Sequence, residues 1–309
     1  MAFYINRFSM IERQIYKIDI ITPMFLSGAE QQGNAEFRTA TVKGMLRFWW
    51  RALHPELVNN GNFKNLKEKE SEIFGDAGEK FGKSKVKISI TSANLKTKKY
   101  SPLPHKEKNN FTYECLDVGQ GLYLTLYAPE EIHNLFRFMS IAGGLGKRSR
   151  RGFGSFSINN DDKLKKIDLD ILLNLIKSVN SNNLFKIDNI EPNKIICDKK
   201  DKYIADNLIS EYPFLIEIQI GKKIKQYGDL LKDIGKASHE HNSDYTGFAR
   251  GRCRLASPVY VSVIKIEDNF MPIISSLNTA FDNKGNNKSA NNLPDRSLEF
   301  KNKILSYGD

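Results

Sequence analysis

Residues 143–156 read GGLGKRSRRGFGSF, which places four cations within five residues and frames them with five glycines. Glycine lets a bulky polyanion approach main-chain N–H groups, and arginine offers a planar fork of donors that matches phosphate oxygens. The run therefore predicts a phosphate-binding loop. Its expected backbone-approach glycines are Gly143, Gly144, Gly146, Gly152 and Gly154, and its expected phosphate-binding cations are Lys147, Arg148, Arg150 and Arg151.

The segments around this run predict a split βαβ plan. Apolar positions on one face indicate helices over about 39–53 and 130–142, and period-2 alternation indicates strands at 16–20, 85–91, 122–127 and 155–158. The order strand, helix, strand, strand, helix, strand is that of the ferredoxin-like fold. Residues 1–160 are thus expected to form one α+β domain, in which the basic loop joins the second helix to the last strand.

The second half shows a similar but weaker layout. Alternation predicts strands at 214–220 and 258–266, a helical pattern covers 227–234, and a loop is expected over 236–256. Residues 161–309 are therefore expected to form a second ferredoxin-like domain, of the same broad type as RNA-recognition domains. The polar residues 59–85 indicate a long connection with at most one helical turn, and the tail from Asp282 is expected to pack little.

The helix expected at 39–53 has a basic face opposite its apolar one. Residues spaced by three, four or seven lie on one side of a helix, and this spacing joins Lys43, Arg47, Trp50 and Arg51. Trp49 lies on the apolar face and is expected in the core. For Trp50 two interpretations stay open, stacking on a base or burial against a neighbouring strand.

Two further sets of residues complete the candidate RNA contacts. Arg38 precedes the basic helix, and the loop over 236–256 reads as a looser second basic loop. Only thirteen of the 47 cations of the chain are arginine, and six of these fall in the tracts 148–151 and 250–254. Arginine is therefore placed locally, which favours phosphate recognition. The candidates in the second loop are Tyr245, Arg250, Arg252 and Arg254.

The composition of the 309 residues indicates a globular chain with an acidic partner. The net charge is +11, and no apolar run approaches the roughly 18 residues that a membrane span needs. The three cysteines show no CxxC spacing, which argues against a disulfide framework or a zinc ribbon. We therefore expect a cytoplasmic protein without metal, cofactor or membrane partner.

The glycine run does not fit known nucleotide loops. A P-loop would need glycine at Ile141 and Ser or Thr at Arg148, and a dinucleotide turn would need glycine at Ser149 or Ser157. Residues 151–154, RGFG, do match the opening of the first RNP motif of RNA-recognition domains, but Ser155 stands where an aromatic residue is expected.

Catalysis has little support in the sequence. His54, His239 and His241 lie beside cations and are the candidates for acid–base cleavage of RNA. No Ser-His-Asp set or carboxylate pair can be recognised, so we expect no catalytic residue.

Three segments together resemble a known family: residues 21–28 (ITPMFLSG), residues 43–52 (KGMLRFWWRA) and the glycine run. They are similar to the RAMP superfamily of type III CRISPR-Cas effectors, and within it to the first subunit of the Cmr complex. Residues 254–258 (RLASP), which lead into the strand predicted at 258–266, also resemble this family.

This resemblance implies two tandem ferredoxin-like domains and a non-catalytic RNA-binding role in a type III-B interference complex. It implies a position near the 3′ end of CRISPR RNA and the 5′ end of target RNA, with both RNAs and other Cmr subunits as partners. Lys43, Arg47 and Arg51 would then line the RNA path with the cations of the basic loop. A metal-independent endoribonuclease that processes CRISPR RNA and an RNA-independent structural adaptor stay open as alternatives.

Overall fold

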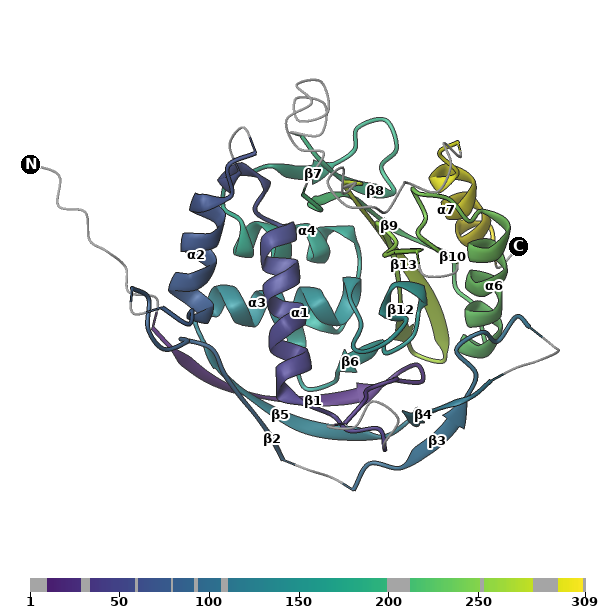
Figure 1. Cartoon of the computed structure of the whole chain (residues 1–309), viewed down its shortest axis with the longest axis horizontal. Coiled ribbons are helices and arrows are strands. Elements are labelled where there is room, and N and C mark those ends of the chain that lie inside the picture. Colours follow the sequence, from purple (N-terminus) through teal and green to yellow (C-terminus); the bar gives the residue numbers. More distant parts are fainter. Residues whose placement is uncertain are drawn as a thin grey trace, which may run out of the picture.

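The chain folds into two antiparallel sheets with helices packed between and beside them (Figure 1). The computed structural model describes residues 10–28, 34–58, 61–78, 80–91, 94–106, 111–198, 212–250, 253–279 and 294–307. The architecture is of the α+β class, as predicted. No helix within these ranges is long and apolar enough to cross a membrane.

The N-terminal sheet has the strand order β2-β5-β1-β6, and every neighbouring pair is antiparallel. This is the order expected for a ferredoxin-like βαββαβ unit, and it confirms the split βαβ prediction. Its elements are β1 (Glu12–Ile20), α1 (Thr39–Ala52), β2 (Lys87–Thr91), β5 (Gly121–Ala128), α3 (Glu130–Ala142) and β6 (Phe156–Ile158). A separate ribbon pairs β3 (Thr97–Tyr100) with β4 (Tyr113–Leu116).

One face of this sheet is buried and the other is open. Tyr16, Ile18 and Leu124 alternate with exposed residues and are 2% exposed or less, because α1 and α3 cover their side of the sheet. Figure 1 shows α1, α2 and α3 all on this one side. Trp49 is fully buried among aromatic rings of α1, α3 and the second half of the chain, which confirms the core prediction for it.

The polar stretch after α1 corrects the prediction of a long connection. It contains the short η1 helix (Pro55–Leu57) and α2 (Lys64–Phe74), which is 11 residues long. Leu66 and Phe74 are buried on one face of α2, and Glu70 on the same face is only 5% exposed. A buried carboxylate between two apolar positions broke the apolar pattern, so the helix could not be recognised from periodicity.

The second sheet has five strands in the order β12-β13-β9-β8-β7, again antiparallel. Its central part follows the same plan through β9 (Leu215–Ile220), α6 (Tyr227–Glu240), β12 (Val259–Ile266), β13 (Asn269–Leu277) and α7 (Ser297–Leu305). Beside β9, where a ferredoxin-like unit would place its last strand, lies β8 (Lys194–Cys197), which pairs with β7 (Phe185–Ile187). A strand that precedes the unit in sequence therefore occupies this position.

Three predictions for the second half need correction. The region 236–256 contains the end of α6 and a ribbon of β10 (Phe248–Arg250) and β11 (Cys253–Leu255), not only a loop. Strands β7, β8 and β13 were missed. The tail was expected to pack little, yet Phe300 and Ile304 of α7 are fully buried against α6 and β13.

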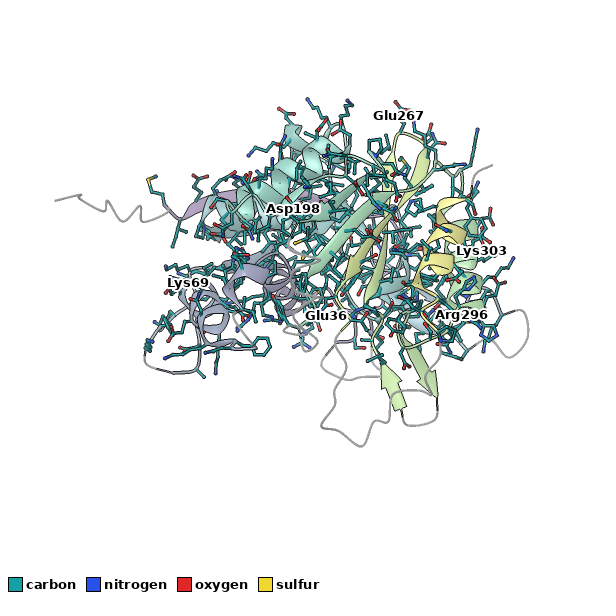
Figure 2. All side chains as sticks on the ribbon, turned by 90° about the horizontal axis from the view of Figure 1, so that it is seen from above. Glu36, Lys69, Asp198, Glu267, Arg296 and Lys303 are labelled. Atoms are coloured by element: carbon teal, nitrogen blue, oxygen red, sulfur yellow. The ribbon has the colours of Figure 1, made fainter. Side chains whose placement is uncertain are left out.

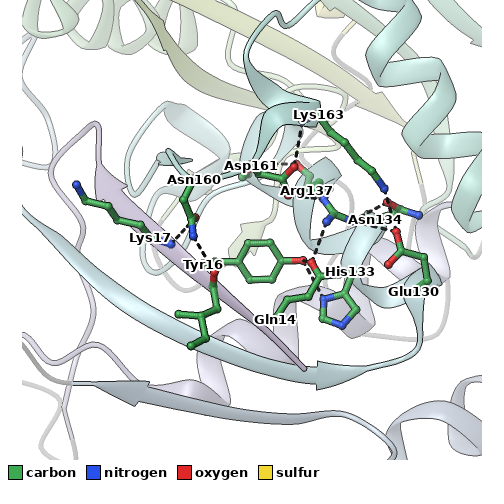
Figure 3. Close-up of polar contacts among 12 residues, drawn as sticks. Gln14, Tyr16, Lys17, Glu130, His133, Asn134, Arg137, Asn160, Asp161 and Lys163 are labelled. Carbon is green, nitrogen blue, oxygen red and sulfur yellow. Dashed lines mark hydrogen bonds and ion pairs between the residues drawn. The ribbon is translucent and has the colours of Figure 1, made fainter. Parts of the chain in front are cut away.

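A buried polar cluster holds β1, α3 and the segment that follows β6 together (Figure 3). The guanidinium of Arg137 donates to Asp161 Oδ2 at 2.6 Å and to Gln14 Oε1 at 2.9 Å. It also lies over the ring of Tyr16, whose hydroxyl is 2.8 Å from His133 Nδ1. Burial raises the pKa of Tyr16 and lowers that of His133, so both are neutral near pH 7.

The two sheets share a large hydrophobic cluster, and a second cluster lies between β12, β13, α6 and α7. A continuous cluster of buried residues runs from Tyr16 in β1 to Leu277 in β13, and η3 (Asp162–Leu164) leads to α4 (Leu169–Val179), which packs on α3. Figure 2 shows side chains filling the space between the layers, with charged residues such as Lys69 and Glu267 on the outside. Residues before and after the expected domain boundary at residue 160 thus pack into the same hydrophobic cluster.

Candidate nucleic-acid interface

The basic loop is held between two segments that are far from it in sequence. On one side the N–H of Lys147 donates to Phe25 O and that of Gly154 to Pro23 O, at 2.9 and 3.0 Å. On the other side the N–H of Gly152 donates to Val261 O in β12 at 2.6 Å. The loop therefore lies where the segment after β1 meets the second sheet, so both halves fix its shape.

The glycines of the loop serve this packing. A Cβ atom on Gly154 would lie 1.9 Å from Leu145 O, and one on Gly143 would lie 2.7 Å from the indole nitrogen of Trp49. Gly146 and Gly152 have φ of +88° and +80° and approach Phe25 and α6 in the same way. The structure thus shows close packing between the loop and its own neighbours. The approach of a polyanion to these glycines stays a prediction.

Arg151 points into the interior. It is 8% exposed, and its guanidinium donates to Ser238 Oγ at 2.8 Å, to Val259 O at 3.1 Å and to Thr246 O. It also lies over the ring of Phe300 at 5.0 Å. Burial, with Arg148 and Arg150 close by, lowers the pKa of Arg151 to about 9. We infer from these contacts that Arg151 joins the two halves of the chain and does not bind RNA.

Arg148 and Arg150 face a cavity between the loop, the β3–β4 connection and α6, with a volume of about 620 Å³. Arg148 has φ of +61°, which is rare outside glycine, and its buried Nε has no hydrogen-bond partner. Arg150 donates to Ser257 O and lies over the rings of Tyr260 and Phe48 at 4.8 and 5.5 Å. We call this cavity the basic pocket.

The basic pocket has an excess of positive charge. Its described lining includes four cations, Lys106, Arg148, Arg150 and Arg151, and contains no Asp or Glu. Burial lowers the pKa of Arg148 because the charged guanidinium is partly removed from water. An anion in the pocket would offset this cost, so the arrangement fits a phosphate group.

Lys147 lies beside the pocket on the surface. Its side chain is exposed, and its ammonium is 5.3 Å from the centre of the Tyr113 ring. It remains available to a phosphate.

The cations of α1 lie differently from the expectation. Arg47 Nε and Arg51 Nη1 both contact Glu70 Oε1, at 2.6 and 2.5 Å, so α2 neutralises part of this face. The residues of α1 that meet the basic loop include Phe48, which lies under Arg150, and Trp49, which lies against Gly143. Two of the helix cations that were expected to line an RNA path are thus paired with a carboxylate of α2.

The other residues of this face vary in exposure. Arg38 is exposed and lies 3.5 Å from Gly28 O, and Lys43 is half-buried. Burial and the neighbouring Arg47 lower the pKa of Lys43. Both side chains can still reach solvent.

Trp50 is buried rather than free to stack on a base. It is 2% exposed, its Nε1–H donates to Glu131 Oε1 at 2.7 Å, and its ring stacks on His54 at 4.2 Å. Of the two open interpretations, the structure supports burial.

The second basic loop is described only in part. Arg250 and Arg254 lie on the β10–β11 ribbon, in registers that pair them with Cys253 and Ala249, and Arg252 lies outside the described residues. Tyr245 is partly buried in the turn that leads to this ribbon. Gly247, Leu255 and Ser257 bring the base of this segment to the basic pocket.

The histidines do not form a recognisable catalytic or metal site. His54 Nδ1 is 2.7 Å from Trp50 O and the ring is buried. His239 lines the basic pocket, where its ring centre is 6.0 Å from that of His105. Among the described residues, no three His, Cys, Asp or Glu side chains lie close enough to hold a metal ion.

Two pocket residues were missed by sequence reasoning. His105 and Lys106 follow the Pro102-Leu103-Pro104 break, and nothing in their spacing relates them to a loop forty residues later. The RGFG match to the RNP motif lies in η2 (Ser149–Arg151) and the turn after it, and not on a strand, so it does not mark an RNP-type surface.

Comparisons with known proteins agree with this fold. The model of the RAMP superfamily matches residues 17–157. The Cmr subunit Cmr1-2 of the CRISPR system of Pyrococcus furiosus is 30% identical, over 47% of this chain and 94% of that protein. The subunit Cmr1-1 of the same organism is 28% identical, and the match spans 46% of each protein.

Solved structures cover nearly the whole chain. The apo crystal structure of Cmr1 from Pyrococcus furiosus superposes with a TM-score of 0.57 at 18% identity, over 95% of this chain and 96% of that one. A chain of the type III-B Cmr-beta complex bound to cognate target RNA gives a TM-score of 0.54 at 12% identity, over 96% and 98%. These two likenesses show the fold. The family match and the 30% identity to Cmr1-2 over 94% of that protein lead to one assignment: the chain belongs to the RAMP superfamily, in the family of the CRISPR Cmr1 subunits.

Proposed function

We propose that this chain is a non-catalytic RNA-binding subunit of a type III-B CRISPR interference complex in the cytoplasm. It would contact CRISPR RNA near the 3′ end and target RNA near the 5′ end, beside other Cmr subunits, in antiviral defence. The observation that carries RNA binding is the basic pocket, whose described lining holds three cations besides the buried Arg151 and no carboxylate. We also propose that residues 1–160 and 161–309 are the two RAMP units.

The proposed contact set differs from the first expectation. Lys147, Arg148 and Arg150 are retained, and Lys106 replaces the buried Arg151. Arg47 and Arg51 expose 37% and 35% of their side chains, so they form a second, partly neutralised patch with Arg38 and Lys43. Tyr245, Arg250, Arg252 and Arg254 stay as proposed contacts, and Arg252 lies outside the described residues.

The salt dependence of RNA binding tests the pocket. If four cations each neutralise one phosphate, the logarithm of the affinity for single-stranded RNA should fall with a slope near 0.7 times four. Affinity should then drop about fiftyfold between 50 and 200 mM salt. Fluorescence anisotropy with a labelled single-stranded RNA measures this, and an affinity independent of salt would contradict the proposal.

A matched pair of double variants locates the contacts. Arg148→Ala with Arg150→Ala should halve the salt slope and weaken binding at least tenfold, since hydrogen bonds to charged groups are worth about 1.5–3 kcal/mol each. The control Lys165→Ala with Lys166→Ala removes the same charge from exposed side chains and should change little. Equal losses in the two pairs would show that only net charge matters, and no loss in either would favour the RNA-independent adaptor.

One observation favours the endoribonuclease alternative enough to test it. His105 and His239 lie together in a cationic pocket, an arrangement in which one imidazole could accept a proton and the other donate one. We expect no cleavage of repeat RNA, with or without EDTA, and an unchanged RNA after incubation with His105→Ala or His239→Ala. Site-specific cuts that disappear in either variant would replace the non-catalytic role.

A further inference from the structure

The open face of the N-terminal sheet carries a regular pattern of tyrosines and cations. In the strand registers, Tyr127 of β5 lies between Arg13 of β1 and Lys87 of β2. Four residues earlier on the same strand, Tyr123 lies between Lys17 and Thr91. Because side chains two residues apart share a face, all of these point away from α1 and α3.

The pattern is accessible to solvent. Tyr123 is 50% exposed and Tyr127 is 37% exposed, with Ile15 at 43% between their rows. The cations Arg13, Lys17 and Lys87 are all exposed. Figure 3 shows Lys17 extending away from the buried cluster around Tyr16 and Arg137, and so toward the opposite side of the sheet.

Nothing in the core explains this arrangement. The buried face already supplies the core through Tyr16, Ile18 and Leu124, and a cross-strand contact of an exposed aromatic side chain adds only about 0.2–1 kcal/mol. Arg13 lies over the ring of Tyr127 at 5.9 Å and donates to its hydroxyl at 3.1 Å, which orients the ring. The exposed tyrosine rings and the cations beside them therefore suit a ligand that has flat rings and negative charge.

We propose that this face, defined by Arg13, Lys17, Lys87, Tyr123 and Tyr127, is a second RNA-binding site that stacks unpaired bases of single-stranded RNA. Bases stack on aromatic side chains in many single-strand binders, and RNA-recognition domains use the open sheet of this same fold for it. The lysines and Arg13 would hold the phosphates between the bases. This site is distinct from the basic pocket, which lies at the loop and α6.

The chemistry favours RNA over a protein partner. Lysine is depleted at protein interfaces, but here a lysine lies directly beside each tyrosine, Lys17 beside Tyr123 and Lys87 beside Tyr127. The tyrosines are about 13 Å apart along the strand, so they would hold two separate bases rather than form one apolar patch.

The test uses the full chain and single-stranded RNA that carries the fluorescent base 2-aminopurine. Tyr123→Leu with Tyr127→Leu keeps an apolar side chain but removes the rings, and we expect affinity to fall at least about tenfold and the stacking signal to disappear. Tyr123→Phe with Tyr127→Phe keeps the rings and should restore both. The unfolding midpoints of these variants serve as the check on folding.

Charge is tested in parallel. Lys17→Ala with Lys87→Ala should weaken binding more than the control Lys165→Ala with Lys166→Ala, which removes two exposed charges elsewhere. Equal effects of the two pairs would overturn the site.

The same measurements in the Arg148→Ala and Arg150→Ala background separate the two proposals. Distant sites act independently, so the tyrosine variants should weaken residual binding by the same factor there. If they change RNA affinity in neither background, the sheet site is wrong and the pocket can stand. If they instead abolish binding of another Cmr subunit, the face docks a protein and the proposal falls.

Discussion

Replacing Arg151 with alanine should lower the free energy of unfolding by about 2–4 kcal/mol. The change removes the donors that satisfy the buried carbonyls of Thr246 and Val259, and each unpaired buried group costs about 1–3 kcal/mol. It also removes the contact with the ring of Phe300. Urea unfolding followed by circular dichroism would measure the loss.

The neighbouring exposed Lys147 is the control for this prediction. Lys147→Ala should change stability by less than about 0.5 kcal/mol, while it weakens RNA binding. Arg151→Lys keeps the charge but loses the planar fork of donors. Its loss of stability should therefore lie between those of Arg151→Ala and Lys147→Ala. An Arg151→Ala protein with normal stability and lost RNA affinity would contradict the assignment and return Arg151 to the RNA contacts.

Gly154→Ala should destabilise the chain by about 3 kcal/mol and remove RNA binding at the pocket. Its φ of +67° already costs an alanine about 1–2 kcal/mol, and its Cβ atom would overlap Leu145 O at 1.9 Å. The loop must shift to relieve this overlap, which displaces Arg148 and Arg150. Thermal unfolding and RNA anisotropy on the same sample measure the two effects together.

Gly44 provides the matched glycine control. It lies in the middle of α1, and a Cβ atom there would have no atom within 4 Å. Gly44→Ala should therefore stabilise the chain by roughly 0.5–1 kcal/mol, because alanine has the better helix propensity. If both alanine variants behaved alike, backbone packing would not be the reason for the glycines of the loop.

The elements that could be predicted are those whose apolar pattern is clean. Alternation in β1 and the stripe of α1 and α3 follow directly from which side chains are buried, so they were found with their order. Helix α2 was missed because Glu70 is buried on its apolar face, and its charge is balanced by Arg47 and Arg51 from another helix. These arginines come close to Glu70 only in the folded chain, so the sequence does not show that its charge is compensated.

The site was predictable to the level of the loop but not of the individual side chain. Arg150 and Arg151 are adjacent, chemically identical and both border the basic pocket, yet only Arg151 is buried, with its guanidinium donating to Thr246 O and Val259 O. A tight turn at η2 decides between them, and its geometry depends on the contact with β12. His105 and Lys106 reach the pocket through tertiary contacts alone.

The contact between Gly152 and Val261 has a consequence for the order of synthesis. The ribosome completes the basic loop more than a hundred residues before it makes β12, and at about 5–20 residues per second this delay is roughly 5–20 s. During that interval the cations of the loop lack the strand against which they are ordered. The basic pocket is thus one of the last features of the nascent chain to form, and only a nearly complete polypeptide can present it to RNA.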